Sequence, residues 1–309
     1  MSQPDNPLRR RVLRTLAAAS LSTMSMPLSA DQAPTLVARQ IPASGERLPV
    51  VGLGTYQSFD AGDAALERDP LREVLQLFVQ QGGKLVDSSP MYGRSESVIG
   101  DLAARLGITE RLFMATKVWT SGRQAGIRQM EESMRRMGVT RMDLMQIHNL
   151  LDWKTHLGTL QQWKAQGRIR YIGITHYHAG AYAELQRLMK TGNFDFVQFN
   201  YSIVERDAEA ELLPLAQTLG LAVIVNRPFA QASLFARVRG KSVPAWAEAF
   251  DCRSWAQFFL KYIIGHPAVN CVIPATAKPD HLLDNMRAGM GRLPDDATRR
   301  KMATFMDNL

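Results

Sequence analysis

Four polar side chains in the first half of the chain have the types and spacing needed to protonate a developing alkoxide. Asp87 ends one apolar run, and Tyr92 follows five residues later in a glycine-containing loop. Lys117 lies near the end of the next apolar run, and His148 ends the one after it. A free phenol has a pKa of about 10, which a neighbouring ammonium lowers, while a carboxylate holds that ammonium in place. A histidine that hydrogen-bonds the same substrate oxygen would complete a site for carbonyl reduction.

Repeated strand and helix patterns predict how these side chains come together. Apolar runs of strand length begin near residues 51, 84, 112, 143, 169, 195, 222 and 270, and the first six intervals are 26 to 33 residues. Amphipathic helices are expected between them, over 71–81, 98–106, 130–137, 157–166, 181–189 and 211–219. Each is followed by a glycine suited to a left-handed cap, namely Gly82, Gly107, Gly138, Gly167, Gly192 and Gly220.

Eight such units predict an α/β fold of the (β/α)8 TIM-barrel type, in which the carboxyl ends of all strands meet at one rim. An open, doubly wound sheet is the competing fold. It usually has fewer units, and no Gly-x-Gly-x-x-Gly motif lies between a strand and a helix here. Two segments depart from the repeat. Residues 35–49, with Ser44-Gly45 at a turn, predict a hairpin that closes the barrel floor, and the 48-residue seventh interval contains a long loop over 227–243 that is expected to cover a ligand.

The first 30 residues are typical of an export signal. Arg9, Arg10 and Arg11 precede a weakly apolar stretch that ends in Ser29-Ala30, as in twin-arginine signals. The stretch is too short and too rich in Ser and Thr to span a bilayer. We therefore expect a signal peptide over 1–30, recognised by the export machinery, and a single periplasmic barrel domain over 31–309. The alternative is a disordered basic tail.

The composition argues against several other classes of protein. Cleavage after residue 30 removes four arginines and one aspartate, which lowers the formal charge from +8 to +5, and no dense basic cluster with interleaved aromatics suggests nucleic acid. Cys271 lies in an apolar run and is expected to be a core residue rather than the disulfide partner of Cys252, and the spacing of the two suggests no zinc site. His176 and His178 form a His-x-His pair, but a barrel metallohydrolase would want it at the first strand, so no metal is expected. We expect a monomer without stable membrane insertion.

Three segments resemble the signature sequences of the aldo-keto reductases. They are Gly-Gly-Lys-Leu-Val-Asp-Ser-Ser-Pro-Met-Tyr-Gly-Arg-Ser-Glu at 82–96, Ala-Thr-Lys-Val at 115–118 and Asp-Leu-Met-Gln-Ile-His at 143–148. The resemblance covers essentially all of the chain after residue 36. It implies a (β/α)8 barrel that reduces aldehydes or ketones with NADPH bound across its rim, with NADH also possible. It further implies that Tyr92 is the general acid, that Asp87 and Lys117 tune it, and that His148 orients the carbonyl.

The same resemblance implies the residues that hold the cofactor. Gln198 would hydrogen-bond the nicotinamide amide, while Thr175 and His176 stand where the family usually has Ser and Asn. Asn226 stands where many relatives have a stacking tyrosine, so Arg227 or Phe229 would cover the ring instead. At the last strand Ala275 and Ala277 replace two usual phosphate ligands, which leaves Thr276 and Lys278 for the ribose phosphate. The full expected set is Gly54, Thr55, Thr175, His176, Gln198, Arg227, Thr276, Lys278, Asp284 and Asn285, the last two for adenine.

Two other functions remain open at this point. One is a non-catalytic, nicotinamide-binding or partner-sensing barrel. The other is a lyase in which Lys117 forms a Schiff base with a carbonyl substrate. For a reductase, the apolar side chains Tyr56, Trp119 and Trp153 would line a pocket for an aryl or alkyl substrate.

Overall fold

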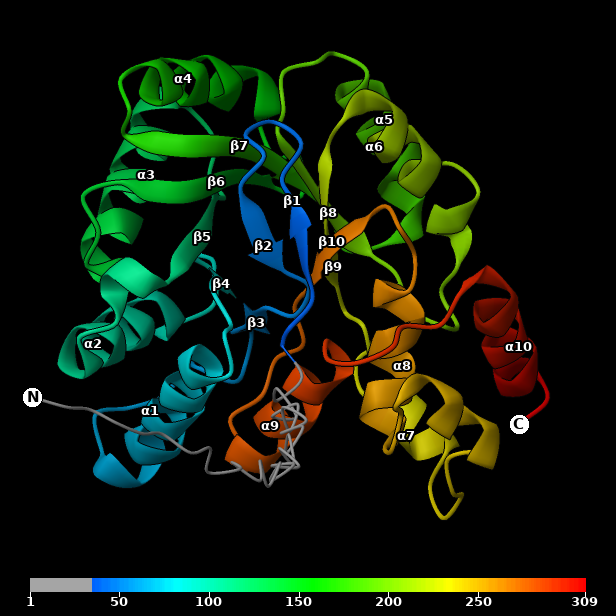
Figure 1. Cartoon of the computed structure of the whole chain (residues 1–309). Helices are drawn as coiled ribbons and strands as arrows, with labels where there is room; N and C mark the ends of the chain where they lie inside the picture. Colours follow the sequence, from blue (N-terminus) through cyan, green and yellow to red (C-terminus); the bar gives the residue numbers. More distant parts are fainter. Residues whose placement is uncertain (1–34) are drawn as a thin grey trace, which may run out of the picture. The chain divides into compact units, whose positions relative to one another are not determined.

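Eight parallel strands form a closed ring in the computed structural model, which describes residues 35–309 (Figure 1). The predicted signal over 1–30 lies outside these residues. The strands are β3 (Leu53–Gly54), β4 (Leu85–Asp87), β5 (Phe113–Val118), β6 (Met142–His148), β7 (Ile169–Thr175), β8 (Phe196–Asn200), β9 (Ala222–Asn226) and β10 (Val269–Val272). They pair in chain order, and bridges from Val51 to Val272 and from Gly54 to Ala275 close the ring. The predicted (β/α)8 barrel is therefore confirmed.

One helix packs outside the ring after each strand, as the periodicity predicts. These helices are α1 (Ala65–Gln80), α2 (Ser95–Leu106), α3 (Arg123–Met137), α4 (Trp153–Ala165), α5 (Tyr182–Met189), α6 (Leu212–Leu219), α8 (Trp255–Ile264) and α9 (Pro279–Ala288). The six glycines predicted to end helices all have positive φ, between 64° and 87°. α3 begins at Arg123 rather than at residue 130, because its polar first turns carry no apolar stripe for the sequence pattern to detect.

A hairpin closes the amino-terminal end of the barrel, as predicted. β1 (Ala38–Gln40) pairs antiparallel with β2 (Arg47–Pro49), and Gly45 takes φ 76° in the connecting turn. Ile41 and Leu48 are fully buried and belong to one cluster with side chains from seven of the eight barrel strands, β4 to β10, including Phe113. The floor of the barrel is thus filled with apolar side chains, and the open end is the rim at which the strands finish.

The interval between β9 and β10 is more ordered than a simple loop. It contains α7 (Ser233–Arg237) and the 3-10 helix η4 (Ala245–Phe250). Before α7 the backbone is tightly turned, since Arg227, Ala230, Gln231 and Ala232 all have positive φ without being glycine. The remaining short helices are η1 (Thr109–Arg111), η2 (Ala179–Ala181) and η3 (Asp207–Glu209), and α10 (Asp296–Asp307) follows the last barrel helix.

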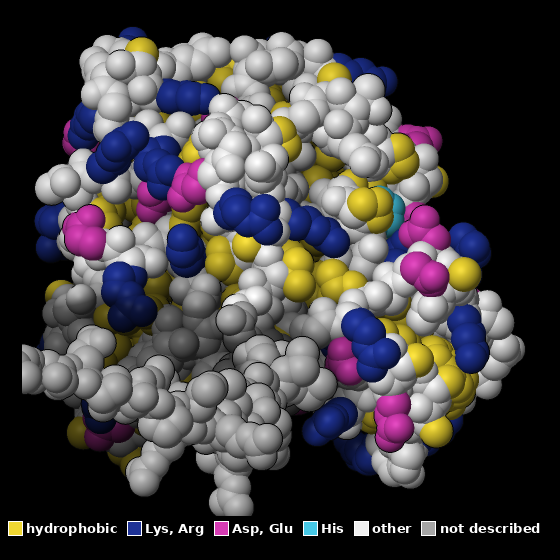
Figure 2. All heavy atoms as spheres, in the orientation of Figure 1, with side chains coloured by type: hydrophobic (Ala, Val, Ile, Leu, Met, Phe, Trp, Pro, Cys, Tyr) yellow, Lys and Arg dark blue, Asp and Glu magenta, His cyan; other side chains and the backbone are white. Residues whose placement is uncertain are grey.

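The buried apolar residues form two clusters, a small one inside the barrel at its floor and a large one that includes the buried faces of the outer helices. On the face drawn in Figure 2, Lys and Arg side chains alternate with Asp and Glu rather than forming one basic field. Cys252 and Cys271 are both buried and free, as expected for core residues. No helix within residues 35–309 has the length and apolar character needed to cross a membrane.

Candidate active site

A buried ion pair lies at the centre of the rim. Asp87 is the last residue of β4 and Lys117 lies on the neighbouring strand β5. Lys117 Nζ donates to Asp87 Oδ2 over 2.6 Å and to the carbonyl of Ser88 over 2.7 Å. Burial alone would lower the pKa of Lys117, but Asp87 and Tyr92 together raise it above its ordinary value. Lys117 therefore stays protonated inside the barrel.

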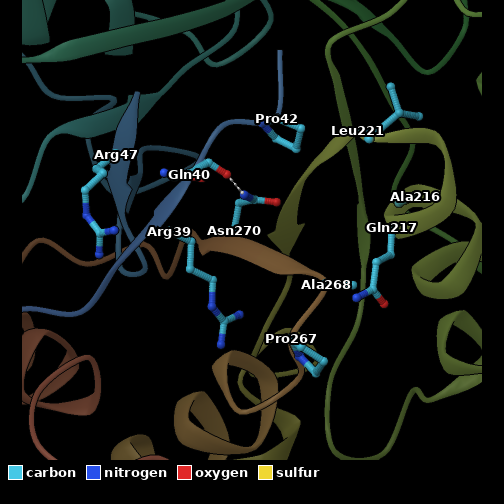
Figure 3. Close-up of a pocket in the computed structure, with 11 residues that line it drawn as sticks. Arg39, Gln40, Pro42, Arg47, Ala216, Gln217, Leu221, Pro267, Ala268 and Asn270 are labelled. Atoms are coloured by element: carbon cyan, nitrogen blue, oxygen red, sulfur yellow. Dashed lines mark hydrogen bonds between the residues drawn. The ribbon is translucent and has the colours of Figure 1, made fainter. Parts of the chain in front are cut away.

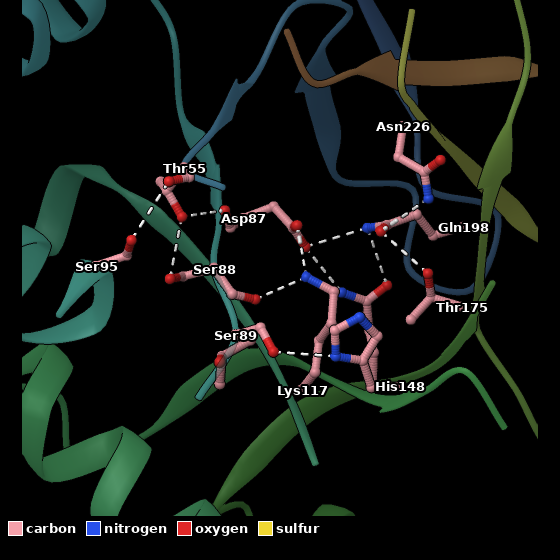
Figure 4. Close-up of polar contacts among 12 residues, drawn as sticks. Thr55, Asp87, Ser88, Ser89, Ser95, Lys117, His148, Thr175, Gln198 and Asn226 are labelled. Atoms are coloured by element: carbon pink, nitrogen blue, oxygen red, sulfur yellow. Dashed lines mark hydrogen bonds and ion pairs between the residues drawn. The ribbon is translucent and has the colours of Figure 1, made fainter. Parts of the chain in front are cut away.

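Two glutamines hold the other oxygen of the same carboxylate (Figure 4). Gln146 Nε2 donates to Asp87 Oδ1 over 3.0 Å, and Gln198 Nε2 donates to the same atom over 3.1 Å. Both side chains are buried, with 0% and 2% of their surface exposed. Sequence reasoning missed Gln146. The detectable signal was a polar residue two positions before His148, because alternate residues of a strand share one face.

Tyr92 reaches the ion pair from the loop after β4. Lys117 Nζ lies 5.0 Å from the centroid of its ring, and the ring of His148 lies 5.9 Å away at 83°. Burial raises the pKa of Tyr92, while the charge on Lys117 acts in the opposite direction. The phenol is therefore protonated at neutral pH, which is the state that a proton donor needs.

His148 ends β6 beside Tyr92. Its Nδ1 lies 3.0 Å from the hydroxyl of Ser89, a contact that sequence reasoning also missed. Burial, with a smaller effect from Lys117, lowers the pKa of His148 to about 2, so the imidazole is neutral under ordinary conditions. The structure thus brings together all four residues that were predicted to be catalytic.

Two exposed aromatic side chains stand next to this group. Tyr56 is 52% exposed, and its ring lies 5.0 Å from that of Tyr92, while Trp119 is 40% exposed and lies 6.3 Å from the ring of His148. Both can therefore contact a substrate. Trp153, the third aromatic residue expected to line the pocket, begins α4, and the guanidinium of Arg187 of α5 lies over its ring at 5.4 Å.

Residues predicted to hold the nicotinamide are grouped around Gln198, but its amide is already fully bonded. Gln198 Oε1 accepts from Thr175 Oγ1 over 3.0 Å and from Asn226 Nδ2 over 3.3 Å. Its Nε2 donates to Asp87. Asn226 Oδ1 and Arg227 Nε are buried without a partner within residues 35–309. His176 follows β7, and its ring stacks on Tyr177 at 5.3 Å.

Gly54 and Thr55, which were predicted to contact the cofactor, make structural contacts in the barrel. A Cβ on Gly54 would lie 2.6 Å from the carbonyl oxygen of Ile273, so glycine is needed for the barrel to close here. Thr55 is fully buried, and its hydroxyl donates to the carbonyl of Asp87 over 2.9 Å. These contacts fix the backbone that carries Asp87.

The predicted phosphate ligands lie at the start of α9. Lys278 is exposed at the N-cap of this helix and takes part in no ion pair within the described residues. Thr276 is nearly buried, and its Oγ1 accepts from the backbone N–H of Lys278 over 3.0 Å. An uncompensated cation at a helix amino terminus suits a phosphate group. This end of the rim therefore fits the phosphorylated ribose of NADPH.

Asp284 and Asn285 are placed side by side on α9, but the carboxylate of Asp284 is already engaged. Ser254 Oγ and Gln257 Nε2 each donate to it over 2.7 Å, which ties α9 to the first turn of α8. Asn285 is 4% exposed. Each oxygen of Asp284 accepts one of these hydrogen bonds and keeps a further lone pair that an adenine amino group could use.

A separate pocket of about 520 Å³ opens at the barrel floor (Figure 3). Arg39 lines it, but its guanidinium donates to the carbonyls of His266 over 2.7 Å, Ile264 over 2.5 Å and also Val269. Asn270 donates to the carbonyl of Gln40 over 2.8 Å. These groups join the hairpin to the end of α8, so the pocket has a structural explanation. Within the described residues, no three His, Cys, Asp or Glu side chains are arranged to hold a metal ion.

Comparison with known proteins identifies the same family throughout the barrel. The sequence model of the Aldo/keto reductase family matches residues 50–301. Methylglyoxal reductase YeaE of Escherichia coli is 31% identical over 257 residues, which span 80% of this chain and 88% of that protein. An NADH-specific methylglyoxal reductase of the same organism is 28% identical over 233 residues, covering 64% of this chain and 69% of that protein. A solved aldo/keto reductase from Klebsiella pneumoniae, in complex with NADP and acetate, shares the fold with a TM-score of 0.73 at 24% identity, covering 85% of this chain and 93% of that one.

Proposed function

Because the chain belongs to the aldo/keto reductase family, we propose that it reduces aldehydes or ketones to alcohols with a nicotinamide cofactor. The observation that carries this proposal is the buried pair of Asp87 and Lys117 directly beneath the ring of Tyr92. Burying two charges can cost more free energy than their attraction returns, so stability alone does not explain this pair. It suits the activation of a phenol as an acid.

NADPH is the cofactor that the rim fits best. Lys278 and Thr276 would hold the ribose phosphate, and Thr175, His176 and Asn226 lie where the nicotinamide end would be bound. The structural relative with bound NADP supports this assignment, and the NADH-specific relative makes NADH possible. When bound, the reduced nicotinamide supplies a hydride for the carbonyl carbon.

The protein's own residues then deal with the carbonyl oxygen. Tyr92 donates its phenolic proton to that oxygen as negative charge develops on it, so that hydride and proton together convert C=O into CH–OH. Lys117 stabilises the phenolate that remains, and Asp87 keeps Lys117 oriented. His148, which is neutral, donates a hydrogen bond to the same oxygen. Lys117 and His148 are held in place before the reaction by their hydrogen bonds to Asp87, Ser88 and Ser89, and such preorganised groups stabilise developing charge effectively.

Small aldehydes are the substrates to test first, since two relatives are methylglyoxal reductases. The exposed faces of Tyr56 and Trp119 beside the site also allow a substrate with an apolar or aryl body. A Schiff-base lyase is disfavoured, because an amine nucleophile must be neutral and the contacts of Lys117 raise its pKa. We also propose that the protein is exported by the twin-arginine route and acts as a single barrel domain in the periplasm.

The proposal is tested by mixing purified protein with NADPH and a panel of aldehydes, ketones and quinones, and following the loss of NADPH absorbance. We expect turnover by the wild type, and a decrease in kcat of at least about a hundredfold in Tyr92→Phe with an unchanged Kd for NADPH. A second variant, Tyr177→Phe, removes an exposed rim phenol and is the matched control. Binding of NADPH without turnover of any carbonyl would favour the non-catalytic, nicotinamide-binding alternative.

A further inference from the structure

We propose that Ser89 is a positioning residue that holds His148 in the tautomer with its proton on Nε2. The role of this proton as a donor to the carbonyl oxygen rests on the proposed function. The tautomer itself follows from the contacts around Ser89 and can be measured without any substrate. Nothing in the position of His148 along the sequence decides which ring nitrogen carries the proton.

The hydroxyl of Ser89 has one hydrogen-bond acceptor within reach. Ser89 is fully buried, and its Oγ contacts two groups, the backbone N–H of Met91 at 3.4 Å and Nδ1 of His148 at 3.0 Å. A backbone N–H can only donate, so Oγ is the acceptor in that contact. Within residues 35–309, Nδ1 of His148 is then the one acceptor available to the hydroxyl. A buried hydroxyl without an acceptor is unfavourable, so Ser89 donates to Nδ1.

This contact decides the state of the ring. A nitrogen that accepts a hydrogen bond carries no proton, and a neutral imidazole has one proton in total, which must therefore be on Nε2. The ring is neutral because burial and Lys117 disfavour the charged form. Turning the ring over would place a carbon against Ser89 and leave the hydroxyl without a partner. The observed orientation is thus the one that satisfies both side chains.

The Nε2–H group that results faces the reaction site. It has no partner within the described residues, and the ring lies between Tyr92, at 5.9 Å, and Trp119, at 6.3 Å. A carbonyl oxygen placed to take the proton of Tyr92 can therefore also accept from Nε2. If the proton were on Nδ1, His148 would present a lone pair to that oxygen and would repel it.

The neighbouring serine provides a matched control. Ser88 is also fully buried, but its Oγ lies 3.0 Å from Oγ1 of Thr55, which can accept its hydrogen, and does not contact His148. Ser88→Ala therefore removes the same atom from the same turn without changing the hydrogen bond to the ring. Ser89→Thr keeps the hydroxyl and tests for rescue.

The tautomer is read from long-range proton–nitrogen NMR correlations of the full chain labelled with ¹⁵N-histidine, with His148→Asn used to identify the signals of His148. We expect the wild type and Ser88→Ala to show a proton on Nε2 and a hydrogen-bonded Nδ1. Ser89→Ala should shift the Nδ1 signal and populate the other tautomer, and Ser89→Thr should restore the wild-type pattern. A proton on Nδ1 in the wild type, or a His148 spectrum unaffected by Ser89→Ala, would overturn the proposal.

Kinetics separate this proposal from the proposed function. We expect Ser89→Ala to lower kcat/KM for carbonyl reduction about two- to tenfold, the range given by the loss of one hydrogen bond, with an unchanged Kd for NADPH. A wild type that reduces no carbonyl would contradict the proposed function, while the NMR spectrum would still decide the tautomer. Full activity in Ser89→Ala together with a mixed tautomer would show that the Nε2 proton is not needed, and would overturn its role as donor.

Discussion

Gln146 donates a hydrogen bond to Asp87 in the interior of the barrel, with 3.0 Å between Nε2 and Oδ1. The two residues are 59 positions apart and come from β6 and β4. A further feature makes room for this contact: a Cβ on Gly173 of β7 would lie 2.8 Å from Cγ of Gln146. The interior of the barrel therefore accommodates the polar side chain of Gln146, and Gly173 provides the space for it.

We expect Gln146→Leu to fold and to bind cofactor normally, but to lower kcat about two- to tenfold. Leucine has a similar volume, yet it leaves Asp87 Oδ1 with only Gln198 as a donor, so the carboxylate holds Lys117 less firmly. Steady-state kinetics with thermal unfolding measure both properties. Gln161→Leu, at an exposed amide that contacts Asn193, is the control. An unchanged kcat in Gln146→Leu would mean that Asp87 needs no second amide.

Removal of the charge on Lys117 should shift the pH dependence of carbonyl reduction. Tyr92 acts as an acid only when protonated, so the rate is constant below its pKa and falls above it. Burial raises that pKa and Lys117 lowers it. Lys117→Met removes the effect that lowers the pKa of Tyr92. The decrease of kcat at alkaline pH should therefore begin at a higher pH, while kcat at neutral pH decreases. A decrease that begins at the same pH would show that another group limits the rate.

Stability should fall below pH 6.5 because His148 is held neutral. Its pKa is lowered to about 2 in the folded protein, whereas an unfolded histidine binds a proton below about 6.5. The unfolded state therefore binds more protons between these values, and stability is lost as the pH falls through 6.5. Between pH 7.5 and 5, the wild type should lose about 2 kcal/mol more unfolding free energy than His148→Asn. Urea unfolding at both pH values measures this difference, and equal losses would contradict a neutral buried His148.

Cofactor choice should depend on Lys278. A charge-assisted hydrogen bond contributes roughly 1.5 to 3 kcal/mol, and each 1.4 kcal/mol is tenfold in affinity. Lys278→Ala should therefore weaken NADPH about ten- to a hundredfold while leaving the Kd of NADH almost unchanged, as measured by fluorescence or calorimetry. Arg287→Ala, at an exposed cation in the last turn of α9, is the control. Equal effects on both cofactors would show that another side chain binds the ribose phosphate, and Arg227 and Arg239 would then be the next residues to replace.

Export should depend on the arginine pair near the start of the chain. Twin-arginine signals are read by a receptor, so replacing Arg9 and Arg10 by lysine should leave the precursor in the cytoplasm although the charge is unchanged. Cell fractionation with antibody detection compares the double variant with the wild type. Replacement of Arg14 by lysine, outside the pair, is the control. Undiminished periplasmic accumulation of the double variant would indicate another route.

The sequence alone determined the barrel and the four residues at its centre. The features used were local ones, namely the strand and helix periods, the glycine caps and the order of Asp87, Tyr92, Lys117 and His148. A parallel barrel brings the carboxyl ends of all its strands to one rim, irrespective of the side chains there. The hairpin at the floor was predictable for the same reason, because its turn and its apolar residues lie within 15 positions of sequence.

Only the tertiary structure decided which partner each polar group takes. Gln198 was expected to hydrogen-bond the nicotinamide, and nothing in the sequence indicated that its amide also donates to Asp87, which is 111 positions away. The carboxylate of Asp284 accepts hydrogen bonds from Ser254, the N-cap of α8, and from Gln257 within it, and the carbonyl oxygen of Ile273, just after β10, leaves no room for a side chain at position 54. A polar group is satisfied by whichever donor or acceptor folding brings within about 3 Å, and that choice is made by segments far apart in sequence.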